Sequence, residues 1–164
     1  DKVKPSLSPS MDIQVSSNFE RLLFDILSGD DKKVASLMND LKIKGFFKLD
    51  QELVKIIKKD FCAEKINDEE TLAIIKNINI ESKFILDPHT ATAFGAAKKN
   101  NNLSEIIILG TAHPYKFLET IKKAISTEIK TPSQLTNMVD KEEKFDILEK
   151  NNSKIKKYIL KKII

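Results

Sequence analysis

The chain has 164 residues, 41% of them hydrophobic and 32% charged, a balance typical of one globular domain rather than a disordered segment. Its 28 basic and 24 acidic residues leave a formal charge of only +4. Arg21 is the single arginine, so we expect no nucleic-acid partner, because base and phosphate recognition favours arginine. A single cysteine, Cys62, excludes a disulfide framework and suits the cytoplasm. The longest apolar run, Ile106 to Leu109, is too short to span a membrane, so no membrane association is expected.

The first half of the chain shows apolar residues at helical spacing. Ser16 or Ser17 is a suitable N-cap for a first helix, which Gly29 ends. Three further helices are predicted: from about Asp31 to Gly45, around Leu53 to Ile57, and after a cap at Asn67 or Asp68. We therefore interpret residues 1–29 as a loop and helix of the site, and residues 30–80 as a helical insertion.

Residues 81–130 are predicted to form a part of the fold that combines a strand with helices. Asp87 and Pro88 suit the cap and first turn of a helix, whose small residues up to Lys99 allow close packing. The β-branched run from Glu105 to Leu109 lacks alternation, which is typical of a strand in a parallel sheet covered on both faces. A helix is predicted over Pro114 to Ile125. One strand makes no sheet, so we expect the rest of the sheet to lie outside this chain.

The remaining residues, 131–164, are predicted to be a C-terminal helical tail. Lys141 to Ile164 are rich in lysine and isoleucine, with apolar residues at helical spacing. The chain as a whole is typical of the last part of an α/β enzyme.

The first candidate functional segment precedes and enters the first helix. Backbone amides at a helix N-terminus bind anions, and Asn18 and Arg21 add donors beside them. The alternative is an ordinary capped helix with Arg21 in a surface salt bridge.

The second segment contains His89, which follows Asp87 and Pro88 at a helix start. His89 is a candidate proton shuttle or phosphate donor. The alternative is a plain helix entry. No third histidine or paired cysteine supports zinc, so no metal site is predicted.

The third segment follows the predicted strand, at the end where open α/β sheets bind ligands. Gly110 permits close approach, Thr111 offers a hydroxyl, and His113 and Lys116 lie on the first turn of the next helix. The alternative is a tight turn capped by threonine.

These three segments, in this order, resemble signature elements of the threonine synthase family. LSPSMDI at 7–13 with SNFER at 17–21 is similar to its first element, LDPHTA at 86–91 to its second, and GTAHPYKF at 110–117 to its third. The resemblance covers residues 7–117.

The resemblance implies an α/β fold of the tryptophan-synthase β type, of which this chain is the C-terminal portion, helix-rich with few parallel strands. It implies a lyase that uses pyridoxal 5'-phosphate to convert O-phospho-L-homoserine and water to L-threonine and phosphate. Thr111 matches the hydroxyl that meets the cofactor's ring nitrogen. Candidates for substrate binding are Asn18, Arg21, His89, His113 and Lys116.

The family's Schiff-base lysine and its glycine-rich phosphate loop, in SFKD-type and SGNFG-type motifs, do not occur in this sequence. We therefore expect no catalytic residue here, a missing N-terminal part of the same enzyme as partner, and no activity of this piece alone. Two alternatives remain: a non-catalytic helical interaction module, and another enzyme of the same cofactor fold, such as a threonine dehydratase or cysteine synthase. An enzyme predicts that the three segments converge, whereas a module predicts that they scatter.

Overall fold

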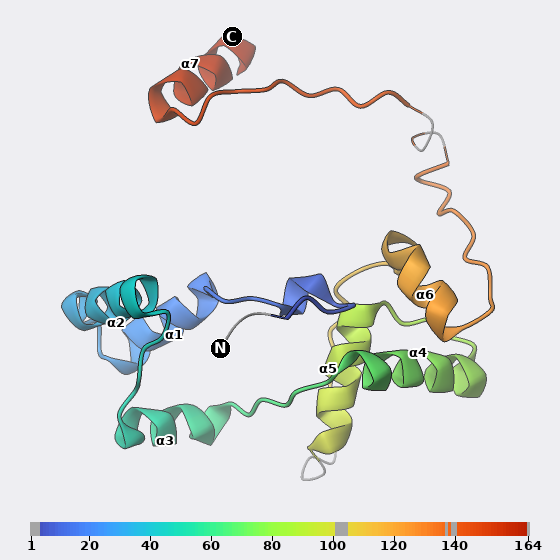
Figure 1. The fold of residues 1–164 in the computed structure, drawn as a ribbon, viewed down its shortest axis with the longest axis horizontal. Helices are drawn as coiled ribbons and strands as arrows, with labels where there is room; N and C mark the ends of the chain where they lie inside the picture. The colour runs from blue at the N-terminus through green and yellow to red at the C-terminus, as the bar shows by residue number, and fades with distance from the viewer. Residues whose placement is uncertain (1–3, 101–104, 137, 139–140, 164) are drawn as a thin grey trace. The chain divides into compact units, whose positions relative to one another are not determined.

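The computed structural model describes residues 4–100, 105–136, 138 and 141–163. The chain divides into two compact units, Asp1–Ile129 and Lys130–Ile164. Among the described residues the regular elements are all helices, of which η1 and η2 are 3-10 helices (Figure 1). In chain order they are η1 (Pro9–Met11), α1 (Ser17–Ile26), α2 (Asp31–Lys44), α3 (Gln51–Asp60), α4 (Asp68–Ser82), α5 (Pro88–Lys99), η2 (Pro114–Phe117), α6 (Leu118–Ala124) and α7 (Asn152–Ile163).

Side-chain caps determine where these helices begin. The Ser16 hydroxyl accepts a hydrogen bond from the third amide of α1, and Asn67 forms a reciprocal capping box with Glu70 at the start of α4. Asp87 caps α5, and Gly45 ends α2 in the left-handed conformation at φ 77°. The predicted helices up to residue 99 are therefore confirmed, with Ser16 and Asn67 as the actual caps.

The helices α1, α2 and α3 pack through a small apolar contact. α1 lies against both α2 and α3. Leu23 is fully buried, and the rings of Phe19 and Phe47 stack with their centroids 6.4 Å apart.

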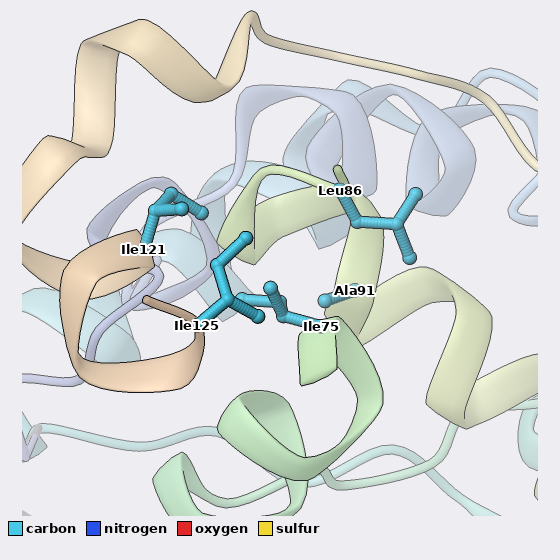
Figure 2. Packing of buried hydrophobic residues seen from close by; sticks show 5 residues of the cluster. All are labelled: Ile75, Leu86, Ala91, Ile121 and Ile125. Atoms are coloured by element: carbon cyan, nitrogen blue, oxygen red, sulfur yellow. The ribbon is translucent and has the colours of Figure 1, made fainter. Parts of the chain in front are cut away.

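The main core lies among α4, α5 and α6, because α4 packs against both of the others. Figure 2 shows the buried side chains of this cluster: Ile75, Leu86, Ala91, Ile121 and Ile125. Gly95 brings α5 close to its neighbours, since a Cβ there would lie 2.7 Å from Ile74 Cδ1. The predicted close approach of this helix is therefore confirmed.

The predicted strand at 105–109 is wrong for this structure. Residues 105–110 are non-helical, and no strand occurs in the part of the chain that the structure describes. Ile107 is 91% exposed, so the run has no covering layer here. A strand exists only when its backbone groups pair with another strand. The described fold is accordingly all-helical, which corrects the α/β class with few parallel strands that the sequence predicted.

The predicted extent of the tail helix is also wrong. α7 begins only at Asn152, because the side chain of Asn151 accepts hydrogen bonds from the backbone amides of Ser153 and Lys154 and so caps the helix there. Residues 142–149 have no regular structure, and none of the described residues of Lys130–Ile164 is buried. The apolar spacing before residue 151 therefore has no packing surface to stabilise a helix.

Candidate functional site

Three segments that are far apart in the sequence meet at the first turn of α5. We call this contact the motif junction, and it consists of Ser10, Asp87, His89, Thr90, Thr111 and Phe117. Ser10 belongs to η1, which packs against α5, and Thr111 and Phe117 come from the loop and η2 after the extended run. One part of each segment therefore lies at the junction, as the enzyme interpretation predicts, but Asn18 and Arg21 of the first segment do not.

Asp87 is the acceptor at the centre of the junction. Its carboxylate is 2% exposed and accepts from the backbone amides of His89 at 2.9 Å and Thr90 at 3.3 Å. The Thr90 hydroxyl donates to its second oxygen. These charge-assisted bonds satisfy the buried carboxylate at the helix N-terminus, where the dipole also favours a negative charge.

His89 is 3% exposed, and both of its ring nitrogens have partners. Nε2 accepts from the backbone amide of Ser10 at 3.0 Å, and Nδ1 lies 3.3 Å from Asp87 Oδ1. Its ring packs against that of Phe117 in a T-shaped arrangement, with centroids 4.7 Å apart. Protein groups therefore surround the His89 ring in this structure. The prediction that His89 contacts substrate stays a prediction.

Two hydroxyl contacts complete the junction. The backbone amide of Thr111 donates to Thr90 Oγ1 at 3.3 Å, which ties the loop of the third segment to α5. Thr92 Oγ1 donates to Ser8 Oγ at 3.3 Å, which ties the residue before η1 to the same helix. Neither Ser10 nor Thr90 was predicted as a site residue. A threonine three positions after a capping aspartate can nevertheless donate to that aspartate, as Thr90 does to Asp87.

Three of the predicted site residues lie on the exposed side of the third segment: Thr111, His113 and Lys116. His113 caps η2, because its Nδ1 accepts from the backbone amide of Tyr115 at 3.1 Å. The Lys116 ammonium lies 5.6 Å from the centroid of the Phe117 ring. Polar donors are thus presented to solvent directly beside the junction.

Asn18 and Arg21 lie on α1, which packs against α2 and α3 rather than forming the junction. Both are exposed, and the Arg21 guanidinium donates to the Asn18 side chain. The structure does not bring them into the motif junction.

A cavity of about 720 Å³ opens between the N-terminal segment and the start of α4. Its lining includes Ser8, Asp12, Asp68 and Thr92. Glu70, nearby on α4, binds Lys99 of α5 at 2.7 Å, and this partner and the Asn67 amide hold the pKa of Glu70 below its ordinary value.

Neither a metal centre nor a membrane span is seen in the described ranges. Within them, no three histidine, cysteine or carboxylate residues gather as a metal site would require. The helices there are too short or too polar to cross a bilayer.

Comparison with known proteins assigns this arrangement to a class. A family model described as "Threonine synthase, C-terminal" matches residues 90–159. The chain is 38% identical over 162 residues to a threonine synthase of Pseudomonas aeruginosa, and this match covers 97% of the chain but 34% of the relative. It is 41% identical over 144 residues to the yeast (Saccharomyces cerevisiae) threonine synthase, covering 77% of the chain and 28% of the relative.

A solved structure shares the fold. The threonine synthase of Brucella melitensis, crystallised with pyridoxal phosphate bound, superimposes with a TM-score of 0.81 at 34% identity, over 97% of this chain and 34% of that one. The fold is thus that of a helical part of larger pyridoxal-phosphate enzymes. More narrowly, the chain is a homologue of the C-terminal region of threonine synthases, and it spans about a third of their length.

Proposed function

We propose that this chain supplies the C-terminal part of a threonine synthase, a lyase that forms L-threonine and phosphate from O-phospho-L-homoserine and water. The observation that carries the proposal is the motif junction. Ser10 bonds to His89 and Thr111 bonds to Thr90 across 79 and 21 positions of sequence. A helical interaction module gives no reason for the three segments to meet in this way.

The proposed cofactor contact is the hydroxyl of Thr111. Pyridoxal phosphate, when bound, supplies an electron sink for proton removal from the substrate. The donor chemistry of this chain fits it, because Thr111 is exposed while its backbone amide is fixed to Thr90. The neutral Thr111 hydroxyl would bond the ring nitrogen without holding it protonated, as a carboxylate would.

The proposed phosphate contacts are the exposed donors beside Thr111. Since Nδ1 of the exposed His113 accepts from the Tyr115 amide, its Nε2 is the nitrogen left to donate. Lys116 adds a positive charge on the same turn. Asn18 and Arg21, at the start of α1, are the further candidates for an anionic leaving group.

The proposed partner is the upstream part of the same cytoplasmic enzyme. It would supply the cofactor-binding lysine and the strands with which residues 105–110 pair. The exposed apolar side chains of Ile106, Ile107 and Leu109 are the surface that such pairing would cover.

A chimera tests the proposal. The upstream two thirds of the Pseudomonas aeruginosa relative are joined to this chain, and threonine and phosphate release from O-phospho-L-homoserine are assayed, with the intact relative as positive control. We expect both products in equal amounts. A soluble chimera that binds pyridoxal phosphate but forms no threonine contradicts the proposal.

The chain alone gives the complementary test. We expect no threonine, and no lysine labelled after mixing with pyridoxal phosphate and reducing with borohydride, because the lysines that the structure describes are exposed and hydrated. Mass spectrometry reads the labelling. Stoichiometric modification of one lysine, with threonine formed, would show that the chain contains a complete site.

A further inference from the structure

The ring of His89 is held between one group that only donates and one that only accepts. The backbone amide of Ser10 donates to Nε2 at 3.0 Å, so Nε2 carries no proton. Nδ1, which lies 3.3 Å from a carboxylate oxygen of Asp87, is left as the nitrogen that can carry a proton. The hydrogen bond from Ser10 therefore favours the tautomer of His89 that carries its proton on Nδ1.

His113, the second histidine of the chain, has the opposite arrangement. Its Nδ1 accepts from the backbone amide of Tyr115 at 3.1 Å, which places the proton on Nε2. His113 is exposed, whereas His89 is buried. The two histidines thus accept a backbone amide on opposite ring nitrogens, Nε2 in His89 and Nδ1 in His113.

We propose that His89 is a positioning residue, a neutral Nδ1–H imidazole that fastens η1 to the first turn of α5. The Asp87 carboxylate lies beside Nδ1, and the Phe117 ring of the third segment packs at a steep angle against the imidazole. The backbone amide of Ser10, which donates to Nε2, is the group that His89 positions.

The consequence is a fixed spacing between the first and third segments. The same turn of α5 holds Ser10 through His89 and Thr111 through the Thr90 hydroxyl. Two independent bonds from one rigid helix end thereby set the place of the Thr111 hydroxyl relative to the turn around Ser10. Only the use of this spacing for catalysis depends on the proposed function, since the proton position and the bonds do not.

The proton position is measured directly in the unmodified chain. Long-range ¹H–¹⁵N NMR spectra are recorded in alkaline buffer. We expect His89 to show a protonated Nδ1 and a bare Nε2, and His113 the reverse. A proton on Nε2 of His89 overturns the proposal, because the Ser10 amide then has no acceptor.

Matched variants test the bond to Ser10. A glutamine side chain reaches about as far as Nε2 and offers a carbonyl oxygen there, whereas asparagine reaches only to Nδ1. We expect His89→Asn to speed hydrogen exchange at the Ser10 amide roughly two- to tenfold, and His89→Gln to restore protection. In both variants hydrogen exchange at the Thr111 amide should stay as slow as in the unmodified chain.

Thr90→Val serves as the reciprocal control, because it removes the hydroxyl that accepts from the Thr111 amide while keeping the shape of the side chain. Faster exchange at Thr111 with Ser10 unchanged is expected. Equal effects of all three variants on Ser10 and Thr111, or no effect of His89→Asn at Ser10, overturn the proposal. Failure of the chimera described above would leave these results intact and would count against the proposed function alone.

Discussion

The motif junction and the unit Lys130–Ile164 both depend on polar bonds, but the bonds differ in reach. In the junction, Ser10 bonds to His89 across 79 positions. In the second unit, Tyr158 donates to Asp146 across 12 positions and Lys154 to Glu149 across 5, and both bonds are exposed. Bonds of the first kind require the surrounding fold, whereas those of the second kind need only a short segment and contribute little in water. Polar residues are therefore informative about function where they are buried and distant in sequence.

The largest contrast between the two regions should come from truncating apolar residues. Ile75 in the core of the first unit is 0% exposed, whereas Ile147 in the second unit is 89% exposed. We expect Ile75→Ala to lower the free energy of unfolding by about 2–5 kcal/mol through lost contacts and a cavity. Ile147→Ala should change it by less than about 0.5 kcal/mol. Denaturant titration followed by circular dichroism measures both, and equal effects would remove the distinction between the units.

A smaller effect is expected at the start of α4, which is a local feature inside the first unit. Asn67 accepts from the Glu70 amide at 2.9 Å, and the Glu70 side chain accepts in return from the Asn67 amide. Asn67→Ala should destabilise the unit by about 1 kcal/mol, while Asn67→Asp, which keeps the acceptor, should cost much less. Denaturant titration measures the free energy of unfolding of both variants. An equally large decrease in the aspartate variant would exclude capping as the cause.

The smallest effect concerns Asp146 in the second unit. The Tyr158 hydroxyl, followed by the Lys162 ammonium, lowers the pKa of this exposed carboxyl, and the same bond raises the pKa of Tyr158. Because the folded pKa is lowered, the stabilisation is present above the ordinary carboxyl value of about 3.9 and is lost as pH falls through the lower folded value. Helical content of α7, followed by NMR during acid titration, should fall slightly over that window.

Asp146→Asn is the control for that titration. It should abolish this acid-induced step and leave the rest of the curve unchanged. A step that persists in the asparagine variant would assign the change to another carboxyl of the unit.

The helices of the first unit were predictable because their ends are determined by neighbouring residues. Ser16, Asn67 and Asp87 each cap an amide within three positions, so the signal is local. The run at 105–109 has the composition of a buried strand, but a strand depends on partners that lie elsewhere in the fold. The predicted extent of the tail helix was wrong for a related reason, because helical spacing without a packing surface does not stabilise a helix by itself.

The candidate site was predictable only in part. Composition and spacing pointed to Thr111, His113 and Lys116 through their place after an apolar run, and the family resemblance linked the three segments. No local pattern shows that the Ser10 amide donates to His89, because the two are brought together by packing of η1 on α5. The role of a buried histidine is set by such partners, and sequence alone left it open between ligand contact and helix entry.

The most direct test of the account is the pair Thr111→Val and Thr111→Ser in the chimera loaded with pyridoxal phosphate. Valine keeps the shape but removes the hydroxyl proposed to meet the ring nitrogen, whereas serine keeps the hydroxyl. We expect Thr111→Val to shift the cofactor absorbance spectrum and to lower kcat/KM by roughly two- to tenfold or more, and Thr111→Ser to retain both. Unchanged turnover and an unchanged spectrum in Thr111→Val would contradict the claim that this chain contributes the cofactor contact.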